Sequence, residues 1–312
     1  MLIFYRIQAW IYSAGLLLCL SGCLTNTKQP SVIRTLREST LIDNADRTPV
    51  ISAQPVITVW IHGTKGTCRK FKFIKTIRYF FDCLPGLHHK EELSHDFHMR
   101  TLADTIANAD TDHFEPAGFY LFGWSGELCF KARHKAAEDL HAALYDIVHQ
   151  YRLKTDTDPI LRIITHSHGG NVALLLAEVM EATQQPLNID SLILLACPVQ
   201  DRTADLIQHQ AFKKVYVIYS PGDLFQIGDP QGAYKGHKAS SFFSRRHFAP
   251  RDNLRHVMIK YNGRAIAHIE FICLRFAALL PAILKETDRW YADMETVVKK
   301  PYEFDLTLNI KK

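Results

Sequence analysis

The chain has 312 residues and a formal net charge of +5, with 47% hydrophobic and 22% charged residues. This is the composition of a globular protein that buries a large core, and the length fits one α/β domain with insertions. The charge is modest and no nucleic-acid-binding motif accompanies it, so we expect no nucleic-acid partner.

The N-terminus has the pattern of an export signal. Arg6 is the only charged residue before a largely apolar run, Ile7 to Leu20, which is shorter than the about 20 residues that span a bilayer. The run ends in Leu20-Ser21-Gly22-Cys23, which resembles the lipobox of bacterial lipoproteins. That resemblance implies removal of residues 1–22, a diacylglyceryl group on Cys23, and a membrane-anchored place in the bacterial cell envelope, at the inner or the outer membrane. A plain signal peptide or a core helix is the alternative.

Residues 23–54 are expected to comprise the lipidated cysteine and a polar tether, because residues 24–54 lack sustained periodicity. The folded domain is expected over 55–290. Its five cysteines are an odd number, so in an exported protein at least one is free or paired between chains. Cys68 and Cys83 are close enough in sequence to bridge a short loop, a question that the sequence leaves open. No CxxC pair indicates a structural zinc site.

Apolar strands alternate with helical segments along this domain. The first strand, over 56–61, ends at His62-Gly63. Residues 69–82 carry apolar residues at helical spacing with basic residues between them, which predicts a helix packed on a sheet. A lid or a membrane-facing helix is the alternative for this segment. We expect insertions over about 83–116 and 230–254, and a tail over 291–312. Further strands are predicted over 118–122, 160–165, 191–196, 214–219 and 256–261, with helices after residues 126 and 167 and over about 269–285.

Strands that are apolar throughout and alternate with amphipathic helices predict a mostly parallel central sheet with helices on both faces, which is an α/β fold. Functional side chains in such sheets lie at the carboxyl ends of the strands. We therefore examined the residues that directly follow each strand.

Ser167 has the sequence context of a catalytic nucleophile. It lies in Thr165-His166-Ser167-His168-Gly169, between a predicted buried strand and an amphipathic helix. This segment resembles the nucleophile elbow of α/β hydrolases, written G-x-S-x-G, with Thr165 in place of the first glycine. The other S-x-G segments, at Ser13 and Ser220, lack this strand-to-helix context. The alternative role for Ser167 is that of an ordinary helix N-cap.

The resemblance to α/β hydrolases covers roughly residues 55–285 and implies the chain order serine, then acid, then histidine. Asp223 follows the strand over 214–219 and is the expected acid, with Asp201 and Asp229 as alternatives. His268 follows the last strand and is the expected base. His256, at the start of that strand, and His247, in the basic insertion, are the other candidates.

The same resemblance implies two backbone N–H groups that bind the oxyanion. His168 directly follows the nucleophile and supplies one. His62-Gly63-Thr64 resembles the H-G motif of lipases and esterases, so Thr64 supplies the second. Phe122-Gly123-Trp124-Ser125-Gly126 resembles a segment of some bacterial lipase-like hydrolases and is expected only to line a pocket.

These residues predict a serine esterase of lipase type, which forms an acyl-enzyme, needs no metal or organic cofactor, and acts on an ester or lipid substrate. An acyltransferase using the same residues, or a non-catalytic surface lipoprotein that binds a ligand, are the alternatives. Thr165-His166-Ser167-His168 also resembles the start of the metallo-β-lactamase motif T-H-x-H-x-D-H. Gly170 and Asn171 stand where that motif needs its aspartate and last histidine, so a metal site is not expected.

Overall fold

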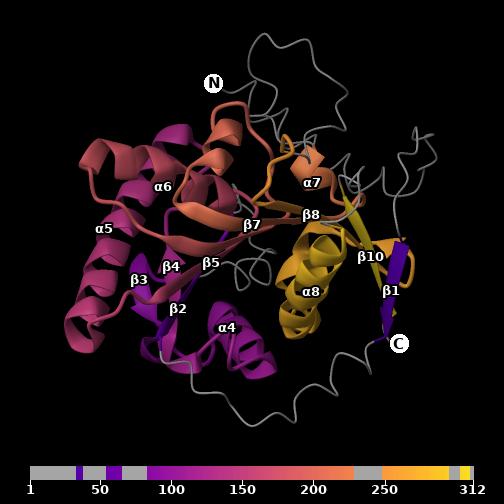
Figure 1. Ribbon diagram of the computed structural model, residues 1–312, viewed down its shortest axis with the longest axis horizontal. Coiled ribbons are helices and arrows are strands. Elements are labelled where there is room, and N and C mark those ends of the chain that lie inside the picture. The colour runs from indigo at the N-terminus through magenta and orange to yellow at the C-terminus, as the bar shows by residue number, and fades with distance from the viewer. Residues whose placement is uncertain (1–32, 38–53, 65–82, 228–247, 295–302, 310–312) are drawn as a thin grey trace, which may run out of the picture.

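The computed structural model describes residues 33–37, 54–64, 83–227, 248–294 and 303–309 (Figure 1). The expected signal peptide, Cys23, the helix over 69–82 and most of the 230–254 insertion lie outside these residues. So do Asp229 and His247, two of the alternative site residues.

Ten strands of the described chain form one sheet in the order β1-β10-β8-β7-β6-β5-β2-β4-β3, with the short β9 paired to β8. Neighbouring strands are parallel except for β3 against β4 and β9 against β8. The strands are β1 (Ile33–Arg37), β2 (Val56–Ile61), β3 (Gly86–His89), β4 (Phe119–Gly123), β5 (Ile160–His166), β6 (Ile189–Leu195), β7 (Phe212–Tyr219), β8 (Leu254–Tyr261), β9 (Arg264–Ala265) and β10 (Phe304–Asn309).

Helices cover both faces of this sheet, with α5 and α6 together on one side and α4 and α8 on the other (Figure 1). The α-helices are α4 (His98–Ala109), α5 (Phe130–Thr155), α6 (Gly169–Thr183), α7 (Leu224–Ile227) and α8 (Leu274–Asp293). Short 3-10 helices occur at η4 (Lys90–Glu92), η5 (Pro116–Gly118), η6 (Ala204–Gln208) and η9 (His268–Ile272).

The central strands are apolar on both faces because helices cover both. All six residues of β2 are buried, and so are the last six of β5. Helix α6 is buried almost all round, since it lies between the sheet and α5. The apolar faces of α4 and α8 complete a second core with the opposite side of the sheet. The predicted α/β class, with a mostly parallel sheet and helices on both faces, is confirmed.

Two strands lie outside the domain limits of 55 and 290. Residues 33–37, expected in the tether, form β1, and residues 304–309, expected in the tail, form β10. β10 pairs in parallel with both β8 and β1 and so extends the sheet. Both strands are short and mix polar with apolar residues, so neither has the continuous apolar run that identified the central strands. The prediction that these segments lie outside the fold was wrong.

The expected insertion over 83–116 also contains regular structure. It forms β3, η4 and the 12-residue helix α4, whose buried residues include Met99, Leu102 and Ile106. Polar residues such as Arg100 and Asp104 lie between these apolar residues and obscure the spacing in the sequence. Among the described residues, no helix has the length and apolar character needed to span a membrane. The thiols of Cys129 and Cys273 are free, whereas Cys68 lies outside the described residues.

Candidate active site

Every predicted site residue that the structure describes follows a strand of the parallel part of the sheet. His62-Gly63-Thr64 follows β2, Ser167 follows β5, Asp223 follows β7, and His268 comes after β8 and its short partner β9. Because parallel strands end at the same edge of a sheet, residues that are up to about 200 positions apart converge there. The fold thus brings the predicted nucleophile, acid, base and oxyanion donors to one edge.

Ser167 occupies a strained corner between β5 and α6. Its φ is +54°, in the left-handed region that residues with a side chain rarely adopt. The corner is tight enough to require glycine on either side. A Cβ on Gly63 would lie 2.8 Å from the Ser167 Cβ, and a Cβ on Gly169 would lie 2.6 Å from the His62 carbonyl oxygen. This geometry matches the nucleophile elbow that the sequence predicts.

Thr165, which replaces the first glycine of the motif, is accommodated within β5. Its side chain is fully buried and its hydroxyl donates a hydrogen bond to the carbonyl oxygen of Ile193 on the neighbouring strand β6 (3.2 Å). The buried hydroxyl is thereby satisfied, so the departure from the motif does not disturb the corner.

His268 and Asp223 form a hydrogen-bonded pair. The Nδ1–H of His268 donates to Asp223 Oδ2 at 2.7 Å, and the Asp223 side chain is fully buried. The other carboxylate oxygen, Oδ1, accepts the backbone N–H of Gln226 (3.0 Å). Because Nδ1 carries the proton, Nε2 of the neutral ring holds a lone pair and is the atom that can act as a base.

The loops that carry this pair are fastened to each other. The Ser220 hydroxyl oxygen accepts the backbone N–H of Ile266 (2.8 Å). A Cβ on Gly222 would approach the Ala265 Cβ to 2.9 Å, so glycine permits this close contact. The two loops that carry Asp223 and His268 are therefore held together by direct contacts, although 45 residues separate these two residues in the chain.

The alternative acid and base within the described residues lie elsewhere. Asp201 is exposed to solvent. His256 is buried in β8, three strands away from β5, and its backbone N–H donates to the Tyr291 hydroxyl (2.8 Å). Of the candidates that the structure describes, Asp223 and His268 are the two that bond to each other.

The Ser167 side chain is 8% exposed, and in the described part of the chain its hydroxyl makes no hydrogen bond. Catalytic hydrogen bonds of this type are commonly long before substrate binds and shorten in the complex. The serine–histidine contact thus remains a prediction, whereas the histidine–aspartate contact is part of the structure.

The two predicted oxyanion donors flank Ser167. His168 is the N-cap residue of α6, whose N-terminal end carries a partial positive charge that favours an anion. Thr64 directly follows Gly63, the residue in contact range of Ser167. The direct contact between Gly169 and the His62 backbone places the two donor segments side by side.

His166 has a role that sequence reasoning missed. Its ring lies 4.5 Å from the His268 ring, centroid to centroid, and its Nε2–H donates to the His268 carbonyl oxygen (3.1 Å). Burial holds the pKa of His166 well below its ordinary value, and the neighbouring His268 adds to that effect. An uncharged imidazole therefore packs against the His268 ring and bonds to the His268 backbone. No sequence signal distinguishes His166 from any other residue in the variable position of the elbow.

Asn171 stands where the metal-binding motif needs a histidine, and its amide is used structurally. Its Nδ2–H donates to the Pro198 carbonyl oxygen (3.1 Å), and its Oδ1 accepts the Thr203 hydroxyl (2.5 Å). These bonds brace the segment after β6 against α6. Across the described ranges of the chain, no cluster of three or more histidine, cysteine or acidic side chains is placed to hold a metal ion.

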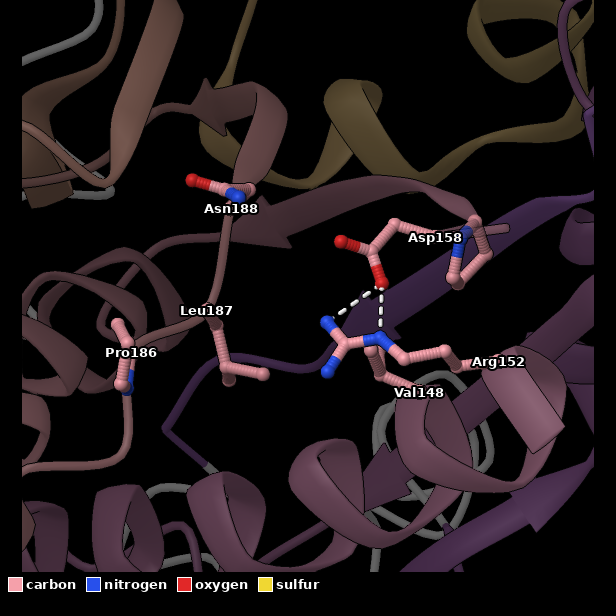
Figure 2. Close-up of a pocket in the computed structure, with 7 residues that line it drawn as sticks. Val148, Arg152, Asp158, Pro186, Leu187 and Asn188 are labelled. Atoms are coloured by element: carbon pink, nitrogen blue, oxygen red, sulfur yellow. Dashed lines mark hydrogen bonds and ion pairs between the residues drawn. The ribbon is translucent and has the colours of Figure 1, made fainter. Parts of the chain in front are cut away.

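A small hollow lies at the opposite end of β5 from Ser167 (Figure 2). Arg152 and Asp158 form an ion pair across it at 2.5 Å, beside Leu187. None of the residues that line it belongs to the loops that carry Ser167, Asp223 and His268, so the hollow is separate from the candidate active site.

Comparison with known proteins found similar solved structures but no relative by sequence. No protein-family model matches the sequence, and no curated protein does. The chain is similar to carboxyl esterase 2 of Tuber melanosporum (12% identity, 79% of this chain and 80% of that chain covered, TM-score 0.41). It is also similar to the carboxylesterase EstE1 from a metagenomic library (12%, 80% and 82%, TM-score 0.38). A third is the esterase of Pyrobaculum calidifontis (16%, 82% and 68%, TM-score 0.34).

At these identities and TM-scores, the likeness carries no argument about activity. The fold class rests on this chain's own topology. Its serine corner after a central parallel strand, followed in chain order by an acid and a histidine at the same sheet edge, is the arrangement of the α/β-hydrolase fold.

Proposed function

We propose that this protein is a serine hydrolase that cleaves carboxylic esters, with Ser167 as nucleophile, His268 as base and Asp223 as the acid that orients it. The observation that carries the proposal is the 2.7 Å hydrogen bond between His268 and Asp223 at the same sheet edge as the strained Ser167. A buried carboxylate bonded to the Nδ1–H of a histidine fixes the tautomer that a serine hydrolase needs.

The proposed reaction has two steps. The Ser167 oxygen attacks the ester carbonyl carbon while its proton passes to His268 Nε2, and the carbonyl electrons move to the oxygen. The Thr64 and His168 N–H groups bind this oxyanion, and Asp223 stabilises the imidazolium. The intermediate collapses, the alcohol leaves with the proton from His268, and water then attacks the acyl-enzyme by the same route to release the acid.

An apolar ester is the substrate that the surroundings favour. Three exposed hydrophobic side chains follow the acid or the base directly: Leu224 (38% exposed), Phe225 (56%) and Ile269 (36%). We call these three the apolar rim. The Phe225 ring lies 5.5 Å from the His268 ring, so the rim adjoins the proposed catalytic pair. Clustered exposed apolar side chains are typical of binding sites, and an ester with an apolar acyl or alcohol part suits this one.

The main test is covalent labelling of the full chain with a fluorophosphonate, which reacts with activated serines. We expect labelling of the wild type and none of Ser167→Ala. Ser125→Ala is a matched control, because it removes an exposed serine hydroxyl that also lies just after a parallel strand, β4. A wild-type protein that resists the reagent would refute the proposal and leave the non-catalytic binding lipoprotein. Product analysis with added alcohols distinguishes hydrolysis from acyl transfer.

We further propose that Cys23 carries a lipid that anchors the enzyme in the bacterial cell envelope. The support is the Leu20-Ser21-Gly22-Cys23 pattern after the apolar run. Acyl chains contribute about 0.8 kcal/mol per buried methylene, so several chains on one cysteine hold a protein firmly. In bacteria fed a radiolabelled fatty acid, the wild type should take up label and remain with membranes, whereas Cys23→Ser should do neither. Equal labelling of both would exclude this anchor.

A further inference from the structure

Trp124 packs on His62 at the sheet edge, and this contact has no role in the mechanism above. Trp124 directly follows β4 and is 5% exposed. Its ring and the His62 ring are stacked, with centroids 5.8 Å apart and an interplanar angle of 14°. Both side chains are buried at the point where β2 ends.

Hydrogen bonds fix the tautomer of His62. The backbone N–H of Trp124 donates to His62 Nε2 (3.1 Å), so this nitrogen carries a lone pair. The proton of the neutral ring is therefore on Nδ1, which donates to the Gly63 carbonyl oxygen (2.7 Å). In addition, the Trp124 indole N–H donates to the His62 carbonyl oxygen (2.8 Å). We call these three bonds and the ring stack the His62–Trp124 clamp.

The clamp sets the direction of one peptide group. The Gly63 carbonyl and the Thr64 N–H belong to the same planar trans peptide, in which they point in opposite directions. Because the His62 ring holds the carbonyl on its own side, the Thr64 N–H points away from that ring. This peptide lies against the nucleophile, since a Cβ on Gly63 would be 2.8 Å from the Ser167 Cβ.

We propose that the His62–Trp124 clamp is a positioning device that orients the Thr64 N–H toward the oxyanion before substrate arrives. This inference rests on the proposed hydrolase function. A donor fixed in advance needs no reorganisation when charge develops, which is the condition for strong oxyanion stabilisation. His62 and Trp124 act through Thr64 and do not themselves touch the reacting atoms.

Two variants remove different parts of the clamp. His62→Phe keeps a ring but loses both the acceptor for Trp124 and the donor to Gly63. Trp124→Phe keeps the ring stack and the backbone N–H and loses only the indole bond to the His62 carbonyl. Trp60→Phe is the matched control. Trp60 is 1% exposed and lies on β2, the strand that ends just before His62, and its indole N–H has no hydrogen-bond partner among the described residues.

The measurements are kcat and KM for a short p-nitrophenyl ester and the affinity for an alkyl trifluoromethyl ketone. Addition of the Ser167 oxygen to the ketone carbon, with its proton passing to His268, gives a stable tetrahedral oxyanion. We expect His62→Phe to lower kcat and ketone affinity together by about 10²–10³-fold, the effect of losing one oxyanion donor. Trp124→Phe should lower both by a smaller factor. KM should change little in either variant, and Trp60→Phe should match the wild type in all three quantities.

The two proposals fail in different ways. If the wild type hydrolyses the ester and reacts with fluorophosphonate, but His62→Phe and Trp124→Phe both bind the ketone as tightly as Trp60→Phe does, the clamp proposal is wrong and the hydrolase proposal stands. The clamp proposal is also wrong, and the hydrolase proposal again stands, if the two variants change KM but leave kcat and ketone affinity unaltered. If the wild type neither hydrolyses the ester nor labels, both proposals are overturned. Circular dichroism and thermal midpoints of the three variants distinguish a lost donor from a lost fold.

Discussion

At the residue scale, the hydrogen-bond partner of each histidine near Ser167 decides which ring nitrogen carries the proton. The Nδ1–H of His268 donates a hydrogen bond to Asp223, so the neutral ring has its lone pair on Nε2. His62 accepts at Nε2 and donates from Nδ1 to a backbone carbonyl. His166 donates from Nε2 to the carbonyl of His268 and is held uncharged by burial. Three imidazoles in one small region thus have three different roles.

Replacing Asp223 tests the first of these roles. Asp223→Asn preserves size but removes the charge that stabilises the imidazolium, and its amide NH2 can donate to Nδ1 and so favour the wrong tautomer of His268. We expect kcat for ester hydrolysis to fall by about 10⁴-fold, the loss known for the equivalent change in a serine protease. The far-ultraviolet circular dichroism should stay that of the wild type. Asp201→Asn, at an exposed carboxylate, is the control and should keep full activity. A silent Asp223→Asn beside an inactive Asp201→Asn would contradict the assignment of the acid.

Sequence position was sufficient to propose Ser167, Asp223 and His268, because Ser167 directly follows a recognisable apolar strand and the other two come within a few residues of the end of one. The structure places the Asp223 and His268 side chains within hydrogen-bond distance of each other, and their catalytic roles remain a proposal. The roles of His62, His166 and Trp124 were beyond reach. They depend on hydrogen bonds to residues 62 and 102 positions away, and no local pattern marks such contacts.

At the scale of elements, α7 and η9 bring the apolar rim to the catalytic pair. Leu224 and Phe225 begin α7 directly after Asp223, and Ile269 follows His268 in η9. Two short elements therefore carry both the proposed chemistry and the proposed contacts with the apolar part of the substrate. Substrate preference and catalysis are close neighbours in the chain for that reason.

The rim is tested by truncation. Leu224→Ala and Phe225→Ala should each raise KM for a long-chain ester several-fold and leave hydrolysis of an acetate ester nearly unchanged. Each buried methylene contributes about 0.8 kcal/mol, so the effect should grow with acyl length. Leu153→Ala is a matched control, because Leu153 is 74% exposed near the far end of α5. An identical chain-length profile for the wild type and both rim variants would exclude this role.

β10 is tested through its buried aromatic residue. Phe304 is fully buried and its ring stacks on Trp290 of α8, with centroids 4.9 Å apart. Phe304→Ala should lower the free energy of unfolding by about 3–5 kcal/mol in urea titrations, the usual cost of removing a core phenylalanine. Thr307→Ala, at a half-buried position of the same strand, should cost far less. If Phe304→Ala were as mild as Thr307→Ala, residues 303–309 would be a tail after all.

The elements that could be predicted are those with a single strong period. β2 is almost entirely apolar, β5, β6 and β7 each contain a continuous apolar run, and α5 repeats apolar residues at helical spacing. β1, β10 and α4 could not be predicted from pattern alone. The two strands depend on pairing partners that lie far away in sequence, and the apolar residues of α4 are interleaved with charged ones.

At the scale of the whole molecule, burial of histidines couples folding to pH. Burial lowers the pKa of His98 and His166, and it lowers the pKa of His113 to about 4. An unfolded histidine has a pKa of about 6.5, so between these values the unfolded chain binds more protons and stability falls as pH falls. Glu303 acts in the opposite sense, because burial raises its pKa to about 7 and the folded state then binds its proton more readily.

The histidine effect is measured by urea unfolding at pH 7.5 and pH 5. Over this interval the His113 shift alone should cost the wild type about 2 kcal/mol of stability, whereas protonation of Glu303 opposes that loss. The test is therefore the difference between the wild type and a variant that lacks the His113 imidazole. His113→Asn should therefore lose less over the same interval, whatever its stability at pH 7.5. The backbone bonds of residue 113 to Asp110 and Arg162 do not need the imidazole. Equal losses in the wild type and the variant would contradict this coupling.

β1 also decides how a soluble fragment of this protein should be designed. In the described chain it pairs with β10 along its whole length and forms the outer border of the sheet. Cutting the chain at residue 54, the apparent end of the tether, would strip this strand away. The peptide groups of β10 would then meet solvent unpaired, and such borders recruit other chains into aggregates. A fragment that starts before Ile33 keeps β1 paired to β10. Its yield of monomer should exceed that of the shorter fragment, and the size of the difference measures how far β1 protects the fold from aggregation.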